Sequence, residues 1–72
     1  MTINKELGMR IRFLREQKKM SIEDLALEAE INKNYLSDLE RGTRNPTIKI
    51  LNKIANALSV NLETLFKGIE GE

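Results

Sequence analysis

Apolar residues recur at intervals of three or four positions along most of the chain, which is the repeat of an α-helix. The clearest run has Leu7, Ile11 and Leu14 on one face. No segment shows the strict alternation of apolar and polar residues that marks a half-buried strand. The pattern therefore predicts an all-α fold, a compact bundle of five short helices over about residues 3–66 with a short, frayed tail at residues 67–72.

Polar capping residues divide this pattern into separate helices. Candidate N-caps stand before the second to fifth apolar runs: Ser21, Asn32, Thr47 and Asn61. Asp24 follows Ser21 by three positions and completes a capping-box pattern. Gly42 is placed to end the third helix in a left-handed conformation, and Asn45-Pro46 breaks the chain before the fourth helix. The fourth helix is predicted to bury Ile48, Leu51, Ile54, Ala55 and Leu58.

The composition argues against several classes of protein. A chain of 72 residues is expected to form one domain, residues 1–72. It contains neither cysteine nor histidine, and no Gly-rich phosphate loop is evident, so we expect no metal, no cofactor and no enzymatic activity. No apolar run approaches the roughly 20 residues that span a bilayer, and no signal-peptide pattern opens the chain. We therefore expect a cytoplasmic protein that does not enter a membrane.

The net charge of +1 hides an uneven distribution of charge. Residues 1–20 carry six positive and two negative side chains, residues 21–32 carry four negative ones, and residues 33–53 carry five positive and two negative ones. A local basic patch, rather than the total charge, is what attracts a polyanion such as DNA. The same charges would also keep a helical surface soluble, so the charge pattern alone leaves both interpretations open.

The connection between the second and third helices is the most informative feature. Only Glu30, Ile31 and Asn32 separate them, and so short a connection favours the steep crossing of a helix-turn-helix. In the segment NKNYLSDLERG, Leu36 and Leu39 face the core. The polar residues of this helix face outward: Lys33, Asn34, Ser37, Asp38 and Arg41. A helix presented in this way fits the major groove of B-DNA, about 12 Å wide, and its first residues reach the base edges.

Most of the chain, about residues 7–66, resembles the phage Cro/repressor-type helix-turn-helix family. The resemblance is carried by LGMRIRFLREQKKMSIEDLALEAEINKNYLSDLERGTRNPTIKILNKIANALSVNLETLF. Within it, LSDLERGTRNPTI is especially similar to small stand-alone regulators such as restriction–modification controller proteins. The match extends over five helices with their caps and turns, so it is far more specific than a single short motif. It implies a lambda-repressor-like fold that binds double-stranded DNA.

The resemblance also implies roles for individual residues. Four positions in the third helix match residues that face or neighbour base edges: Lys33, Asn34, Ser37 and Asp38. Phosphate contacts are expected from a second set: Arg15, Arg41, Thr43, Arg44, Asn45 and Lys49. Arg15 and Glu40 match an ion pair that holds the first helix against the third. Ile22 stands where the family often has a glutamine that reaches DNA, so this chain lacks that contact.

Three side chains have alternative interpretations. A carboxylate such as Asp38 repels phosphate, so Asp38 either accepts a hydrogen bond from cytosine N4 or orients a neighbouring cation and excludes wrong sites. Tyr35, on the flank of the third helix, either packs alone or also contacts a phosphate through its hydroxyl. Arg15 and Glu40 could instead be exposed charges that make no mutual contact.

The sequence therefore predicts a sequence-specific DNA-binding transcriptional regulator. It is expected to act as a homodimer on a two-fold operator, because one such domain contacts too few bases to find its site. The family often dimerises through the last helix, which carries Leu62, Leu65 and Phe66 here. Glu23 matches a position at which some members contact RNA polymerase, so repression and activation both remain open. The alternative function is an antitoxin or antirepressor-like module that binds another protein, with DNA binding secondary.

Overall fold

The computed structural model describes residues 2–71. These residues form five α-helices and no strand, which confirms the predicted fold class. The helices are α1 (Ile3–Gln17), α2 (Ile22–Ala29), α3 (Lys33–Arg41), α4 (Ile48–Ala57) and α5 (Leu62–Leu65). Within the described range, no helix is long and apolar enough to cross a membrane.

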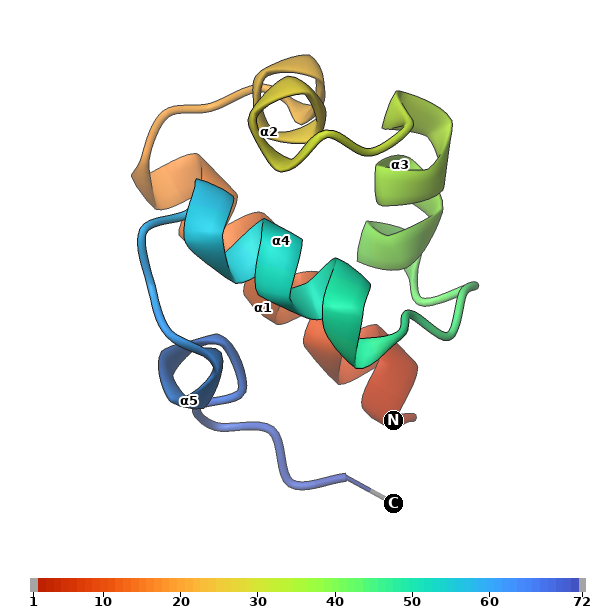
Figure 1. Cartoon of the computed structure of the whole chain (residues 1–72). Helices are drawn as coiled ribbons and strands as arrows, with labels where there is room; N and C mark the ends of the chain where they lie inside the picture. The colour runs from red at the N-terminus through yellow and green to blue at the C-terminus, as the bar shows by residue number, and fades with distance from the viewer. Residues whose placement is uncertain (1, 72) are drawn as a thin grey trace.

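The helices surround one hydrophobic core. α1 packs against α3, α2 packs against both α3 and α4, and α4 packs against α5. In Figure 1, α4 crosses in front of α1, with α2 above them, α3 to the right and α5 below. The core contains these residues: Leu7, Ile11, Leu14, Leu25, Ala26, Ala29, Leu36, Leu39, Leu51, Ile54, Ala55, Leu58 and Leu65. Every helix contributes to it, so the position of each helix depends on the others.

The predicted N-caps are present at the starts of α2, α3, α4 and α5. In each case the side-chain oxygen accepts a hydrogen bond from the backbone N–H three positions later: Ser21, Asn32, Thr47 and Asn61. At α2 the Asp24 carboxylate also accepts from the Ser21 N–H at 2.9 Å, which closes the capping box. Gly42 ends α3 at φ +82°, in the left-handed region that favours glycine. Thr2 caps α1, a contact that was not predicted.

The prediction that Ile48 is buried is wrong. Ile48 is the first residue of α4 and is 66% exposed. Helical side chains point back toward the N-terminus of their helix, so the side chain of the first residue extends beyond the helix end. Ile48 therefore continues the apolar period of α4 but lies outside the core, in which Leu51 is the first α4 residue.

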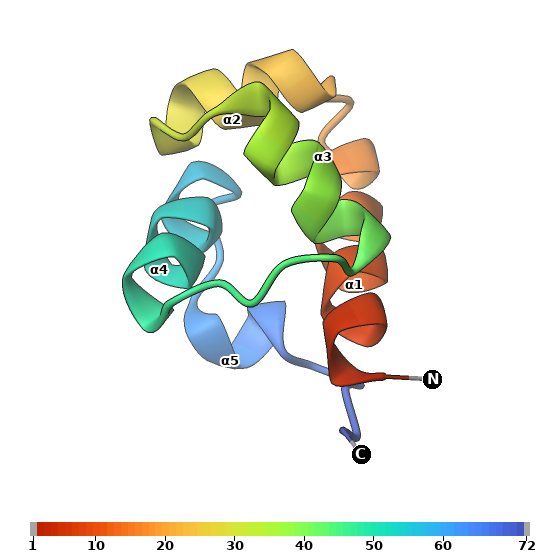
Figure 2. The same cartoon turned by 90° about the vertical axis from the view of Figure 1, so that its right-hand side faces the viewer.

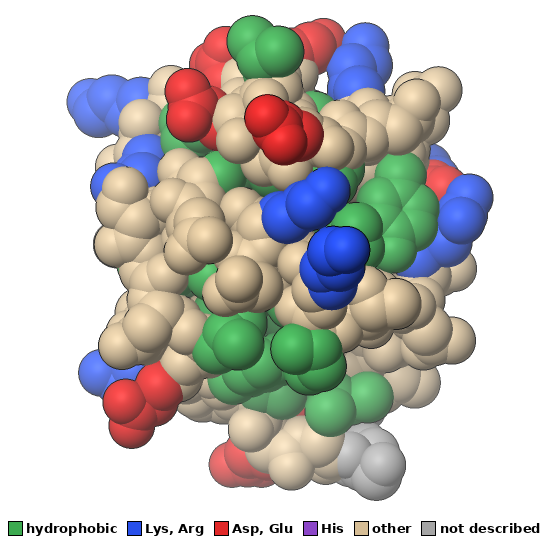
Figure 3. Space-filling model, in the orientation of Figure 1, with side chains coloured by type: hydrophobic (Ala, Val, Ile, Leu, Met, Phe, Trp, Pro, Cys, Tyr) green, Lys and Arg blue, Asp and Glu red, His purple; other side chains and the backbone are tan. Residues whose placement is uncertain are grey.

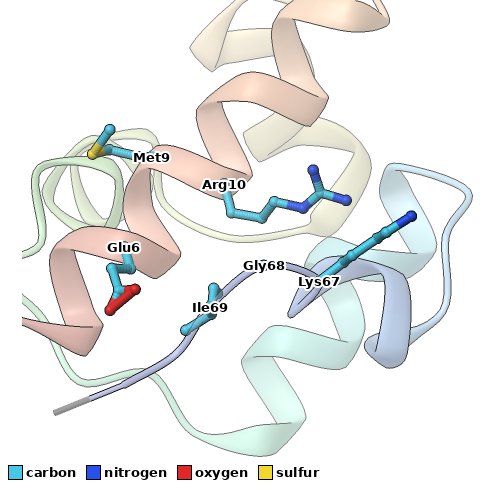
Figure 4. A pocket seen from close by; sticks show the side chains of 6 residues that line it. All are labelled: Glu6, Met9, Arg10, Lys67, Gly68 and Ile69. Carbon is cyan, nitrogen blue, oxygen red and sulfur yellow. The ribbon is translucent and has the colours of Figure 1, made fainter.

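The segment after α5 is packed rather than frayed. Ile69 packs against the core, and the backbone N–H groups of Glu70 and Gly71 donate to the Glu6 carboxylate at 3.2 and 3.3 Å. Figure 4 shows this segment passing beside α1. A surface pocket of about 260 Å³ between them is lined by Glu6, Met9, Arg10, Lys67, Gly68 and Ile69. The prediction of fraying is therefore wrong as far as Gly71, because the tail has partners on a distant helix.

α1 and α3 approach each other closely at Gly8. This glycine is buried within α1, and a Cβ atom added there would lie 2.4 Å from the backbone oxygen of Glu40 and 2.5 Å from that of Leu39. Such distances are far inside van der Waals contact, so only glycine lets the α3 backbone lie directly on α1. The position of α3 therefore depends on backbone packing as well as on its leucines.

Candidate nucleic-acid interface

α2 and α3 cross steeply, as their three-residue connection predicts (Figure 1). Glu30 adopts a left-handed conformation at φ +59°, and the Ile31 N–H donates to the carbonyl oxygen of Ala26 at 3.0 Å. Leu36 and Leu39 anchor the inner side of α3 and are 0% and 2% exposed. The polar side of α3 consequently faces away from the core, and the helix itself lies on the side of the molecule turned toward the viewer in Figure 2.

Lys33 and Asn34 occupy the exposed first turn of α3, where base-reading residues are predicted. The Lys33 ammonium donates to a carboxylate oxygen of Glu23 on α2 at 3.1 Å, and both side chains are more than half exposed. A backbone hydrogen bond at Glu23 and, after it, the Lys33 ammonium lower the pKa of the Glu23 carboxyl. Lys33 is therefore accessible, and its partner in the free protein is a carboxylate of the same chain.

Asp38 lies at the centre of a charged cluster on the outer side of α3. Its carboxylate accepts a hydrogen bond from Arg41 and lies 3.4 Å from Nε of Arg44 in the following loop. The Arg44 guanidinium lies over the ring of Tyr35, 5.2 Å from its centroid, which is a cation–π contact. Ser37 is half-buried beside Asp38. The contacts made by Asp38 are thus those of a residue that orients neighbouring cations.

The ion pair expected between the first and third helices is present. Arg15 Nε and Nη2 donate to the two carboxylate oxygens of Glu40 at 2.7 and 3.0 Å, and Arg15 Nη1 donates to the carbonyl oxygen of Met20 at 2.8 Å. The two charged side chains are only 11% and 7% exposed, which contradicts the alternative of two exposed, unpaired charges. The hydrogen bond to Glu40 raises the pKa of Arg15. The pair therefore fixes α1 against α3.

The loop after α3 and the start of α4 carry most of the other residues expected on phosphates. Four of them are exposed: Thr43, Arg44, Asn45 and Lys49. The Thr43 N–H and hydroxyl both donate to the Asp38 carbonyl oxygen, at 3.0 and 3.2 Å. The Asn45 side-chain oxygen accepts from the side-chain amide of Asn4 on α1, a contact across 41 positions that no local sequence pattern indicates. Figure 3 shows Lys and Arg side chains over α4 and beside α3, with acidic side chains over α2.

The residues predicted to form a dimer interface differ in their exposure. Leu65 is 0% exposed and belongs to the core, so its side chain does not reach the surface. Leu62 and Phe66 are partly buried and pack against the core from its edge. Arg10 on α1 donates from Nε and Nη2 to the carbonyl oxygen of Thr64, at 3.3 and 2.9 Å, and ties α5 to α1. Sequence reasoning missed Arg10 because its acceptor is a backbone group, which any residue could supply.

The chemistry of the α3 face is hydrogen bonding and charge. Its exposed side chains offer ammonium, guanidinium and amide groups, and the half-buried Tyr35 and Ser37 add hydroxyl groups. These are the groups that bind phosphate oxygens and base edges in DNA. Among the residues that the structure describes, no group of three or more acidic side chains is placed to hold a metal ion.

Two relatives from bacteria share this sequence pattern. The chain is 38% identical over 65 residues to the HTH-type transcriptional regulator DdrOP3 of Deinococcus deserti, an alignment that covers 90% of this chain and 50% of that protein. It is 43% identical over 59 residues to the control protein C.BamHI of Bacillus amyloliquefaciens, covering 81% of this chain and 73% of that protein. The chain thus spans about half the length of DdrOP3 and most of C.BamHI.

A solved structure shares the arrangement of the helices. The restriction–modification controller protein C.Esp1396I, crystallised as a tetramer in complex with its natural 35 base-pair operator, superposes with a TM-score of 0.87 at 32% sequence identity, covering 96% of this chain and 91% of that chain. Residues 11–65 match the helix-turn-helix family, a range that runs from the middle of α1 to the end of α5. The chain therefore belongs to the helix-turn-helix family.

Proposed function

We propose that this protein is a sequence-specific DNA-binding transcriptional regulator of the controller type, which places α3 in the major groove. The observation that carries the proposal is the outward-facing first turn of α3, where Lys33 and Asn34 are exposed while Leu36 and Leu39 anchor the helix from inside. This geometry allows two side chains to reach base edges without moving the backbone. A relative with the same helix arrangement forms a complex with its operator, which supports DNA binding by this chain.

Phosphate contacts are assigned to the flanks of α3. The residues with this proposed role are Arg15, Tyr35, Arg41, Thr43, Arg44, Asn45 and Lys49. Arg44 is the best placed of them, because the Tyr35 ring and the Asp38 carboxylate hold it at the exposed edge of α3. Arg15 is the most restricted, because all three of its guanidinium nitrogens already donate to protein oxygens.

The active form is proposed to be a homodimer on a two-fold operator. A single α3 reads few base pairs, and two copies on adjacent half-sites multiply the discrimination. Leu62 and Phe66 offer partly exposed apolar surface at α5, and Figure 3 shows hydrophobic side chains gathered low on the molecule, below the Lys and Arg side chains. Because α5 and α3 lie on different sides of the molecule in Figure 1, one copy can contact a partner and DNA at the same time.

Binding titrations with single substitutions test this function. A preferred duplex is first selected from a random-sequence library and then varied at each position. Lys33→Ala and Asn34→Ala are expected to relax the preference at one or two positions, by about 1–3 kcal/mol each. Arg44→Ala is expected to weaken binding to all duplexes alike. It should also lower the salt slope, the slope of log affinity against log salt concentration, by about 0.9, the value for one phosphate contact.

Lys67→Ala is the matched control, because it removes one exposed positive charge from the tail beside α1 (Figure 4). It should change neither base preference nor the salt slope. The proposal fails if Lys33→Ala and Asn34→Ala leave every base preference unchanged, because specificity would then come from DNA shape or from another protein.

Two finer assignments accompany the proposal. A DNA-binding role supports residence in the cytoplasm. The exposed carboxylate of Glu23 on α2 supports a contact with RNA polymerase. Transcription in vitro at saturating regulator, where DNA occupancy is equal, should fall for Glu23→Gln if that contact activates. Unchanged transcription would leave repression by promoter coverage as the mode of action.

A further inference from the structure

The positive side chains of α3 are already paired within the free protein. Lys33 donates to Glu23, and Asp38 contacts both Arg41 and Arg44. The two arginines are 67% and 52% exposed, whereas the Asp38 side chain is 24% exposed. A single carboxylate that is better buried than its partners therefore holds two cations at the surface expected to meet DNA.

Both oxygens of Asp38 are engaged in these contacts. Oδ1 faces the Arg41 guanidinium, and Oδ2 faces Nε of Arg44. Each of these oxygens has a second lone pair, but accepting a hydrogen bond from a cytosine would bring the Asp38 charge into the strongly negative field of the duplex while both arginines still compete for it. The observed geometry thus favours an action of Asp38 through the arginines over direct reading of a base.

The position of Arg44 is fixed from two further directions. Its guanidinium carbon lies over the Tyr35 ring, 5.2 Å from the ring centroid, in a cation–π contact. The loop that carries it is tied to α3, because the N–H and hydroxyl of the preceding Thr43 donate to the Asp38 carbonyl oxygen. Nε of Arg44 is the nitrogen that lies near Asp38, and its terminal nitrogens donate no hydrogen bond to a residue that the structure describes, so they remain available to a phosphate.

We propose that Asp38 is a positioning residue that determines specificity. It holds the Arg41 and Arg44 guanidinium groups in fixed places at the outer side of α3 and cancels part of their charge. On non-operator DNA, the phosphates must compete with Asp38 for both arginines, so binding is weakened. On the operator, base contacts at the first turn of α3 hold the backbone where phosphates take over both guanidinium groups together. This inference rests on the proposed function, because it concerns discrimination between DNA sequences.

Asp38→Asn tests the inference, because it removes the charge and keeps the shape. Affinity is measured for an operator duplex and a scrambled duplex of equal length over a range of salt concentrations. The affinity for scrambled DNA is expected to rise about two- to fivefold, the range that one exposed ion pair contributes. The salt slope should steepen by up to about 0.9, and the ratio of operator to scrambled affinity should fall. Asp38→Glu should restore that ratio in part.

The same substitution in a variant that lacks both arginines shows whether Asp38 acts on DNA affinity through Arg41 and Arg44. In the Arg41→Ala/Arg44→Ala variant, Asp38→Asn should raise the affinity for scrambled DNA clearly less than it does in wild type, because only the direct repulsion between carboxylate and phosphate is then removed. The inference is overturned if Asp38→Asn acts equally in both backgrounds, or if it only alters preference at one base pair. It is also overturned if the selectivity of wild type is unchanged by Asp38→Asn. A wild-type protein that prefers no duplex would instead overturn the proposed function itself. Circular dichroism of each variant checks that it is folded.

Discussion

At the scale of single residues, burial decides how much an ion pair contributes to stability. The side chains of Arg15 and Glu40 are 11% and 7% exposed, whereas those of Arg12 and Glu16 on the same helix are 65% and 56% exposed. Arg15→Ala is expected to lower the free energy of unfolding by about 3–5 kcal/mol, because it leaves the Glu40 carboxylate buried without its partner. Urea unfolding followed by circular dichroism measures this loss.

Arg12→Ala is the matched control for that measurement. It removes the same side chain from the same helix and should cost under about 0.5 kcal/mol, because the Arg12–Glu16 pair is exposed. Arg15→Ala should also weaken DNA binding, because the Arg15–Glu40 pair fixes α1 against α3. A loss below about 1 kcal/mol for Arg15→Ala would mean that the pair contributes no more than a surface contact.

The capping box of α2 makes stability depend on pH in one direction. Hydrogen bonds from the backbone and side chain of Ser21 lower the pKa of Asp24 below its ordinary value of 3.8. A carboxyl group whose pKa is lower in the folded state stabilises the fold at pH values above the pKa that it has in the unfolded chain. This contribution is lost as the pH falls through the pKa of the folded state. Asp24→Asn should therefore unfold at a lower temperature than wild type near neutral pH.

The difference between wild type and Asp24→Asn should shrink as the pH falls below 3.8. Thermal unfolding of both proteins over a series of pH values gives the comparison. If the difference stays constant into the acidic range, Asp24 acts through its shape as a hydrogen-bond acceptor rather than through its charge.

For Lys33 and Asp38 the outward face could be predicted, but their partners in other elements could not. Helical periodicity placed Lys33 and Asp38 on the outer side of α3, where the structure has them. Glu23 lies ten positions before Lys33 on α2, and Arg44, which contacts Asp38 in addition to Arg41 of the same helix, lies in the loop after α3. Such pairs depend on how the helices cross, which a repeat of three or four residues does not specify.

At the scale of the helices, the close approach of α1 to α3 depends on Gly8. In an exposed helix interior, replacing glycine by alanine stabilises the helix by about 1 kcal/mol. At Gly8 the added methyl group would overlap the α3 backbone, so we expect Gly8→Ala to destabilise the fold by about 1–3 kcal/mol or more. The melting temperature should fall by about 4–8 °C for each kcal/mol lost.

Asn56→Ala serves as the control for helix propensity. Asn56 lies exposed in α4, so its replacement raises helix propensity without a clash and should leave the melting temperature equal or slightly higher. A higher melting temperature for Gly8→Ala would show instead that α1 and α3 separate at no cost, and α3 would not be fixed as described.

Helix boundaries could be predicted well because their signals are local. Ser21, Asn32 and Gly42 act within a few residues of their own position, so sequence alone identifies them. The tail could not be predicted, because its partner Glu6 lies 64 positions away from Glu70. The prediction that Ile48 is buried failed for a related reason. Periodicity gives the direction of a side chain but not the point along the helix at which the packed surface ends.

At the scale of the whole molecule, the exposed part of α5 is the surface on which dimer formation can be tested. Leu62→Lys and Phe66→Lys each place a charge on partly exposed apolar surface, and each should convert a dimer into a folded monomer in sedimentation experiments. Leu65→Lys should unfold the domain instead, because Leu65 is 0% exposed. A wild-type protein that stays monomeric at high concentration, both alone and on DNA, would contradict a dimer at this surface.

The first half of α1 holds three other parts of the chain. Asn4 bonds to the loop after α3, Glu6 holds the tail, and Arg10 holds the end of α5. A helix of 15 residues is a rigid rod about 22 Å long. If two copies form a dimer through α5, this helix connects the dimer interface to the α3 helix of each copy. The length of α1 would then set the number of base pairs between the two operator half-sites. Substitutions at Asn4 or Arg10 would change the preferred half-site spacing without altering any residue that contacts DNA.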